Sequence, residues 1–131
     1  MQINLPETGG GYNLIDLPEA IGLSEKFLSN FEACSGRVKF VDGLHLYTDI
    51  HSDLVISNCA FSELQREVQD MYLEKVILHS KRGFITWNNL GQNNFNAHSI
   101  PELLQIIPNS KIIEEKPLTA KDNCVIIWGG K

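Results

Sequence analysis

The stretch from Asp53 to Glu63 constrains the fold more than any other part of this sequence. An acid opens a short apolar run, Leu54–Ile56, and the small polar residues Ser57 and Asn58 follow at once. This pattern predicts a short buried strand that ends in polar side chains. In doubly wound α/β sheets the carboxyl ends of the strands face the ligand crevice. We therefore expect Ser57, Asn58 and Glu63 to lie where a ligand binds.

A long amphipathic helix is predicted directly after this strand. Residues Ser62–Gln65 match a capping box, in which a hydroxyl and an acid or amide satisfy the first amides of a helix. Helical spacing then places one apolar stripe on the helix, made of Leu64, Val68, Met71, Tyr72 and Val76. A strand that feeds a helix in this way is the repeating unit of an α/β sheet.

The other segments continue the alternation of strands and helices. We expect strands at residues 1–5, 12–16, 37–41, 84–87, 111–115 and 124–128. A helix should begin at Leu17–Pro18 and stop near Gly36, and a second capping box at Ser99–Glu102 should start a short helix. The Asn-rich residues 88–96 predict a loop, and residues 44–52 predict a loop with a short edge element. The order predicts one α/β domain over residues 1–131, mostly parallel, with an antiparallel C-terminal strand pair.

Composition excludes several classes of partner. The formal net charge of −5 argues against nucleic-acid binding, because backbone phosphates require clustered Lys and Arg. No apolar run reaches the roughly 18 residues of a membrane span, and residues 1–7 lack the features of a signal peptide. The cysteines Cys34, Cys59 and Cys124 form no C-x-x-C pair, so we expect reduced thiols and a cytoplasmic location.

Several blocks of the chain carry a resemblance to one family. They are Asp16–Glu19, Asp53–Leu64, Glu67–Val76 and Gly83–Asn88, together with Glu114–Pro117 and Asn123–Trp128 at the C-terminal end. These blocks resemble the sugar O-methyltransferases, a group within the class I S-adenosylmethionine-dependent methyltransferases. The resemblance covers roughly residues 12–129. It implies a Rossmann-like sheet of seven strands with the first at the centre, S-adenosylmethionine as cofactor, and a sugar or glycan hydroxyl as acceptor.

The N-terminal region departs from this family pattern. The family has a glycine-rich loop after its first strand, and Gly9–Gly11 resemble a shortened one. However, parallel neighbours require a crossover of a dozen or more residues, and only about six lie between Leu5 and Tyr12. We therefore expect an incomplete class I methyltransferase fold that lacks its first strand and glycine-loop unit. Either the chain is the C-terminal part of a longer protein, which we favour, or the first unit has been lost. Exposed strand edges would favour homo-oligomerisation.

Three residues are candidates for holding the cofactor. The resemblance gives Asp16, at a strand end, the role of accepting both ribose hydroxyls, which suits a carboxylate. It places Asp42 beside the adenine amino group. Asn58 lies past the end of the central strand and could contact cofactor or substrate. The alternatives are a helix N-cap for Asp16, an Asp-Gly turn for Asp42, and a strand-end cap for Asn58.

Four more residues are candidates for the substrate side. Glu63 could hold a sugar hydroxyl or act as general base, the alternative being a favourable interaction with a helix dipole. Trp87, Asn88 and Asn89 end the next strand, and an aromatic face beside amide groups suits a sugar. The alternative is a core tryptophan followed by an ordinary loop.

No metal site is predicted. Asp49, His51 and Asp53 alternate along the chain, but no second cluster completes a site, and Asp53 more naturally opens the buried strand. The predicted function is therefore methyl transfer from S-adenosylmethionine to a sugar hydroxyl. Two alternatives stay open: a nucleotide-binding α/β module that uses Asp16 on another cofactor, and a non-catalytic interaction piece of a longer enzyme.

Overall fold

The computed structural model describes residues 10–130, apart from the side chains of residues 92 and 93. The chain comprises two compact units, Met1–Leu46 and Tyr47–Lys131, and each is described by itself. The strand expected at residues 1–5 and the first glycine of the shortened loop, Gly9, lie outside the described residues. The expectation of a single domain stays a prediction.

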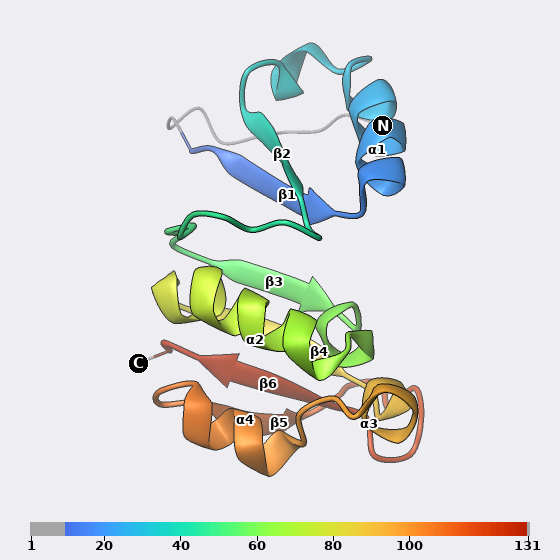
Figure 1. The fold of residues 1–131 in the computed structure, drawn as a ribbon, viewed down its shortest axis with the longest axis vertical. Coiled ribbons are helices and arrows are strands. Elements are labelled where there is room, and N and C mark those ends of the chain that lie inside the picture. Colours follow the sequence, from blue (N-terminus) through green and yellow to red (C-terminus); the bar gives the residue numbers. More distant parts are fainter. Residues whose placement is uncertain (1–9, 131) are drawn as a thin grey trace. The chain divides into compact units, whose positions relative to one another are not determined.

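The first unit is a strand–helix–strand arrangement (Figure 1). Its elements are β1 (Tyr12–Asp16), α1 (Pro18–Leu28), the short 3₁₀ helix η1 (Glu32–Cys34) and β2 (Val38–Asp42). The two strands pair in parallel, in register from Tyr12 opposite Val38 to Asp16 opposite Asp42. The helix between them contacts both strands. A helix that connects two parallel neighbouring strands is their usual crossover.

Helix α1 begins at Pro18 as predicted but ends at Leu28, well before Gly36. Side chains that follow the helix explain the early end. The Asn30 amide donates to the carbonyls of Lys26 and Phe27, and the Ser29 hydroxyl also donates to the Lys26 carbonyl. These bonds satisfy carbonyl groups that a helix leaves unpaired at its C-terminus.

The first unit buries little apolar surface. No residue of α1 is buried, and the side chains of Leu23 and Phe27 are 72% and 52% exposed. Among described residues 10–46, only Cys34, Gly43 and Leu46 are buried. A unit of this size cannot enclose a substantial core, so its stability depends on few contacts.

The second unit contains a four-stranded sheet and the remaining helices. Its elements are β3 (Val55–Asn58), η2 (Phe61–Glu63), α2 (Arg66–Lys75), η3 (Ile77–His79), β4 (Gly83–Trp87), α3 (Leu90–Phe95), α4 (Ile100–Ile106), β5 (Lys111–Glu114) and β6 (Cys124–Trp128). The strand order is β3-β4-β6-β5. Strands β3 and β4 are parallel, whereas β6 is antiparallel to both β4 and β5. The α/β class and the antiparallel C-terminal pair are confirmed, and the pairings of the described strands are evenly mixed, two parallel and two antiparallel.

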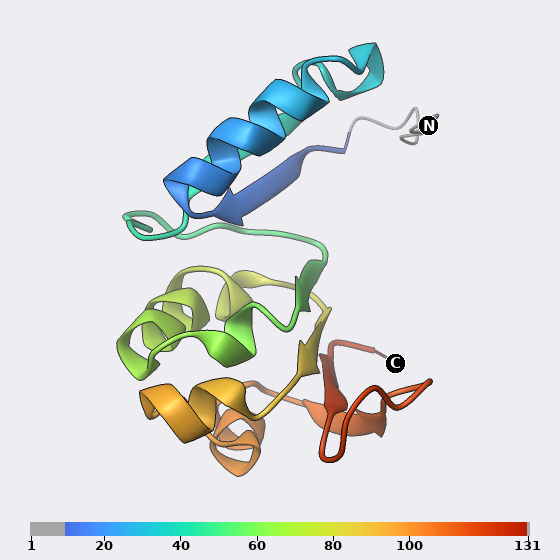
Figure 2. The ribbon, with the colours of Figure 1, turned by 90° about the vertical axis from the view of Figure 1, so that its right-hand side faces the viewer.

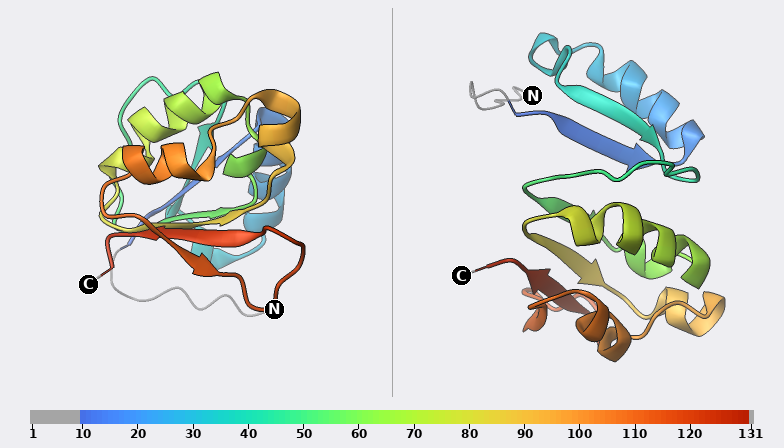
Figure 3. Two further views of the ribbon diagram at one scale, coloured as in Figure 1. Left: turned by 90° about the horizontal axis from the view of Figure 1, so that it is seen from below. Right: turned by 60° about the vertical axis from the view of Figure 1, so that its left-hand side comes forward.

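The core of the second unit lies on one face of this sheet. Helices α2 and α4 both lie on that face, as the two directions of view in Figure 2 and Figure 3 show. Alternate residues of β4 and β6 are buried against them, which is the two-residue period of a strand. The buried cluster consists of Phe61, Leu73, Ile77, Ile85, Trp87, Leu103, Ile107, Cys124, Ile126 and Trp128.

The start of the second helix differs from the prediction. Helix α2 begins at Arg66, after the 3₁₀ turn η2, and no side chain caps it. The Ser62 hydroxyl is buried, donates to the Cys59 carbonyl at 2.7 Å and accepts from the Asn88 N–H at 3.3 Å, so its oxygen is occupied away from the helix. Within α2 only Gln69 and Leu73 are buried, while the predicted stripe is borne out in part, because Val76 is buried and Leu64 and Tyr72 pack against the core. A buried glutamine was unexpected.

Residues 88–96 also differ from the predicted loop, because they contain α3. Asparagine side chains stabilise this short helix rather than break it. The Leu90 N–H donates to Asn88 Oδ1, and Asn96 ends the helix in the left-handed conformation with φ of 50°. The second capping box is confirmed, because Ser99 and Glu102 each accept from the other's backbone N–H.

The edge element expected within residues 44–52 is a single bridge between Ser52 and Ser80, and β3 begins at Val55 rather than Asp53. All three cysteines are free thiols. Among residues 10–130, no helix has the length and apolar character needed to span a membrane.

Candidate functional site

Asp16 and Asp42 end the two parallel strands of the first unit. They are opposite each other in the β1–β2 register, so their Cα atoms lie on neighbouring strands about 5 Å apart. Two carboxylates therefore occupy one carboxyl edge. This is the edge at which α/β sheets usually bind ligands.

The Asp16 carboxylate keeps free accepting capacity. Its Oδ1 accepts from the Leu17 N–H at 2.8 Å, and no other described residue donates to this carboxylate. Leu17, not Asp16, is the N-cap residue of α1. The exposed Asp16 side chain can therefore accept hydrogen bonds from a ligand.

The Asp42 carboxylate is more fully engaged. Its Oδ2 accepts from His45 Nδ1 at 2.9 Å, and its Oδ1 accepts from the Leu44 N–H at 2.9 Å. These two hydrogen bonds, that from His45 first, lower the pKa of Asp42. The arrangement closes the turn at Asp42-Gly43, which is the structural alternative to adenine binding. An adenine amino group would have to share oxygens that already accept.

Asn58 ends β3 in the second unit, opposite Thr86 of β4. Its side chain is exposed at the carboxyl end of β3. The next residue, Cys59, has φ of 58°, which is uncommon for a residue other than glycine. This conformation is fixed by the Cys59 N–H, which donates to both the carbonyl and the hydroxyl of Thr86. The sharp turn directs the chain away from β3 and leaves Asn58 at the carboxyl end of the strand. We call this edge of the second unit, with Asn58, Glu63, Asn88 and Asn89, the rim.

Glu63 is linked to the loop that follows β4. Its Oε1 accepts from the Asn88 side-chain amide at 2.8 Å. The Asn88 N–H donates to the buried Ser62 hydroxyl at 3.3 Å, so Ser62 and Glu63 both contact Asn88. The two loops are therefore joined, and one Glu63 oxygen is occupied within the protein.

Trp87 belongs to the core and not to a substrate site. Its side chain is 0% exposed, so neither ring face is available for stacking on a sugar. Its indole N–H donates to Asn89 Oδ1 at 2.9 Å. The structure thus corrects the expectation for Trp87, while Asn88 and Asn89 lie half-buried at the rim.

His45 and Thr86 were not singled out in the sequence. His45 stands three residues after Asp42, a spacing at which a turn brings side chains together, and this was a usable signal. Thr86 gives no comparable signal, because threonine is an ordinary strand residue. Asp16 and Asn58 belong to different units, and their proximity stays a prediction.

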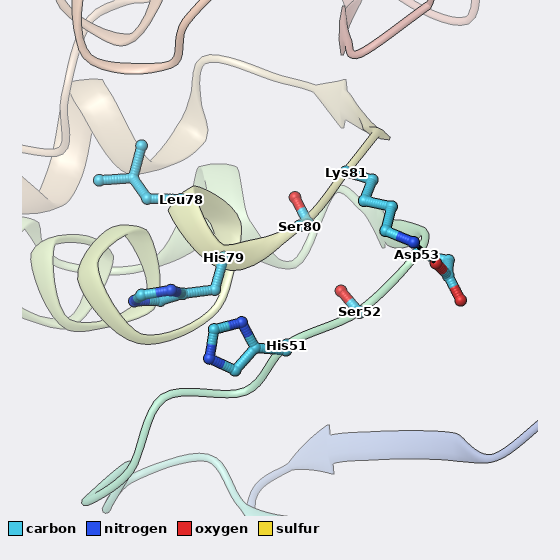
Figure 4. A pocket seen from close by; sticks show the side chains of 7 residues that line it. All are labelled: His51, Ser52, Asp53, Leu78, His79, Ser80 and Lys81. Carbon is cyan, nitrogen blue, oxygen red and sulfur yellow. Dashed lines mark ion pairs between the residues drawn. The ribbon is translucent and has the colours of Figure 1, made fainter.

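A separate open pocket lies at the amino ends of β3 and β4 (Figure 4). It is lined by His51, Ser52, Asp53, Leu78, His79, Ser80 and Lys81. The imidazoles of His51 and His79 meet edge to face with centroids 4.8 Å apart. The buried Ser52 hydroxyl has no hydrogen-bond partner among the described residues.

Two carboxylates near this pocket each form an ion pair with a lysine. Asp49 pairs with Lys75 at 3.2 Å, and Asp53 pairs with Lys81 at 2.7 Å. Hydrogen bonds from these lysines lower the pKa values of Asp49 and Asp53. Within residues 10–130, no three His, Cys, Asp or Glu side chains come together so as to bind a metal.

Comparison of the chain with protein-family models, with curated protein sequences and with solved structures finds no match in any of the three.

Proposed function

We propose that this chain takes part in S-adenosylmethionine-dependent O-methyl transfer to a sugar hydroxyl. The observation that carries the proposal is the pairing of Asp16 with Asp42 at the carboxyl edge of two parallel strands. An acid at such a strand end can accept from both hydroxyls of a ribose. The family resemblance supplies the identity of the cofactor and of the substrate class.

The residues present fit an adenosine group unequally. Asp16 fits well, because it is exposed and only the Leu17 N–H donates to its carboxylate among the described residues. Asp42 fits less well, because His45 and Leu44 already donate to its two oxygens. We therefore assign ribose binding to Asp16 and treat Asp42 as the residue that holds the neighbouring turn closed.

The substrate side is proposed for the rim of the second unit. S-adenosylmethionine, when bound, supplies the methyl group. Asn58 and Asn89 offer side-chain amides that can donate to sugar hydroxyls. Glu63 stays the candidate to take up the hydroxyl proton, through Oε2, since only Oε1 accepts from Asn88. Trp87 is not part of this proposal.

Isothermal titration calorimetry with S-adenosylhomocysteine tests the proposal. We expect binding by the wild type and a loss of at least about tenfold in affinity for Asp16→Asn, because an amide cannot accept from both hydroxyls as a carboxylate does. Glu19→Gln is the matched control, since it removes an acid from the first turn of α1.

Two outcomes contradict the proposal. Binding of NAD but not of S-adenosylhomocysteine would favour the nucleotide-binding module. Binding of neither, with a stable complex formed with a second chain, would favour the interaction piece.

A further inference from the structure

His98 is a buried histidine whose two ring nitrogens are both engaged. Its side chain is 8% exposed. Nε2 lies 2.6 Å from Asp70 Oδ1, and Nδ1 lies 2.8 Å from Arg66 Nη1. A guanidinium group can donate but never accept. Nδ1 must therefore accept from Arg66, and Nε2 must carry the proton that is donated to Asp70, which makes the imidazole neutral.

Arg66 ties this histidine to two further elements. Its Nε donates to the Asn96 carbonyl at 3.1 Å, at the left-handed C-terminus of α3. Its two terminal nitrogens donate to Glu102, the capping-box acid of α4, at 3.1 and 3.4 Å. One guanidinium group of α2 thus joins His98, the end of α3 and the start of α4.

A second connection in the same place does not depend on protonation. The His98 N–H donates to Gln69 Oε1 at 2.7 Å, and the Gln69 amide donates to the Phe61 carbonyl at 2.9 Å. This explains why a glutamine is fully buried in α2. The backbone of His98 is held by Gln69, so only the side-chain contacts can change with pH.

We propose that His98 is a proton-operated latch for the end of α3. A proton added to Nδ1 would face an N–H group of Arg66 and break their hydrogen bond. Glu102 Oε1 lies 3.9 Å from Nδ1, so it can accept a hydrogen bond from the protonated Nδ1. Nδ1 then exchanges Arg66 for Glu102, and Arg66 moves away from the Asn96 carbonyl.

Charged side chains surround the His98 ring. Arg66 and Asp70 face it from α2, and Glu102 faces it from α4. Asp70 and Glu102 favour the charged imidazole, whereas Arg66 opposes it. In the neutral ring Nδ1 therefore faces Arg66, and in the protonated ring it can face Glu102 instead.

The consequence is a pH-dependent order at residues 94–97. Helix α3 follows the rim residues Asn88 and Asn89, so loosening its C-terminus changes the support of that rim. The latch is a property of the second unit and stands whether or not the rim binds a sugar.

Nuclear magnetic resonance of the histidine ring nitrogens tests the latch on the wild-type protein. At about pH 8 we expect the His98 signals of a neutral ring with the proton on Nε2. As the pH falls from about 8 to about 5, amide exchange at residues 94–97, corrected for its intrinsic pH dependence, should become faster by on the order of tenfold. A ring already protonated on Nδ1 at about pH 8, or exchange that does not change as the pH falls, would overturn the proposal.

Two variants separate the latch from other titrations. His98→Gln cannot take up a proton, so the step in exchange at residues 94–97 should disappear. His51→Gln removes an exposed histidine outside the network and should leave the step unchanged. A step that survives in His98→Gln would show that another group controls this segment.

Discussion

The Asn88 side-chain amide donates a 2.8 Å hydrogen bond to the Glu63 carboxylate, and this bond joins the loops that follow β3 and β4. Asn88 also accepts from the Leu90 N–H through Oδ1, so one side chain binds the first residue of α3 and the neighbouring loop. The rim of the second unit is therefore built by side chains that bind each other.

Removing Asn88 should cost more than removing Glu63. Asn88→Ala loses both side-chain hydrogen bonds, and we expect the free energy of unfolding to fall by about 1–2 kcal/mol. Glu63→Ala loses one exposed bond and should cost less than about 1 kcal/mol. Urea denaturation followed by tryptophan fluorescence measures both, because Trp87 and Trp128 both lie in the second unit. Equal costs, with no coupling in the double variant, would contradict this role of Asn88.

Gly91 should not tolerate a side chain. A Cβ atom at this position would collide with the Ser62 carbonyl oxygen, which belongs to the backbone of η2 and cannot move aside without cost. We expect Gly91→Ala to destabilise the second unit by about 2–3 kcal/mol in urea denaturation.

Gly22 supplies the matched control for Gly91. It lies inside α1, and no described atom outside the helix's own backbone lies within 4 Å of the place that a Cβ would take. Gly22→Ala should therefore stabilise the helix by about 0.5–1 kcal/mol. Circular dichroism during urea denaturation measures this change. A stabilising Gly91→Ala would mean that α3 does not pack closely on η2.

Signals confined to a few neighbouring residues were predictable from the sequence. The Ser99–Glu102 capping box formed as expected because both partners and both amides lie within one turn. The same pattern at Ser62 failed, because the left-handed turn at Cys59 brings the Cys59 carbonyl to the Ser62 hydroxyl. Nothing in the sequence marks Cys59 for that conformation.

Contacts between distant segments were not predictable. Trp87 at a strand end suggested a sugar-stacking face, but the alternating burial of β4 places its ring in the core. The burial of Gln69 depends on His98 and Phe61, which are 29 and 8 residues away. Residue periodicity alone cannot identify such partners. The strand-end residues Asp16, Asp42 and Asn58, by contrast, followed directly from strand assignment.

Glu102 should make the second unit sensitive to acid. Hydrogen bonds from Arg66, and then from Ser99, lower the pKa of Glu102 from 4.5 to about 2. A carboxyl group with a lowered pKa in the folded state stabilises that state above its unfolded pKa, and the stabilisation is lost as the pH falls. The window of loss is therefore from about 4.5 down to about 2.

Glu102→Gln should flatten the dependence of unfolding free energy on pH in that window. Urea denaturation at a series of pH values measures it. Glu67→Gln is the control, because Glu67 is an exposed acid of α2 to which no described residue donates. An unchanged slope in Glu102→Gln would contradict the contribution of the Arg66–Glu102 contact.

The first unit should exchange its amides faster than the second. Strands β4 and β6 carry Ile85, Trp87 and Ile126 at 0% exposure, whereas α1 has no buried residue to hold β1 and β2 in place. Local opening is governed by such buried contacts, so we expect amides of β1 and β2 to exchange at least about tenfold faster in hydrogen-exchange mass spectrometry. Equal protection in both units would contradict this ranking.

Addition of S-adenosylhomocysteine should slow exchange in β1 and β2 if Asp16 binds its ribose, because a ligand that binds only the folded state suppresses opening. The ranking depends on the fold alone, so it can hold even where the ligand has no effect.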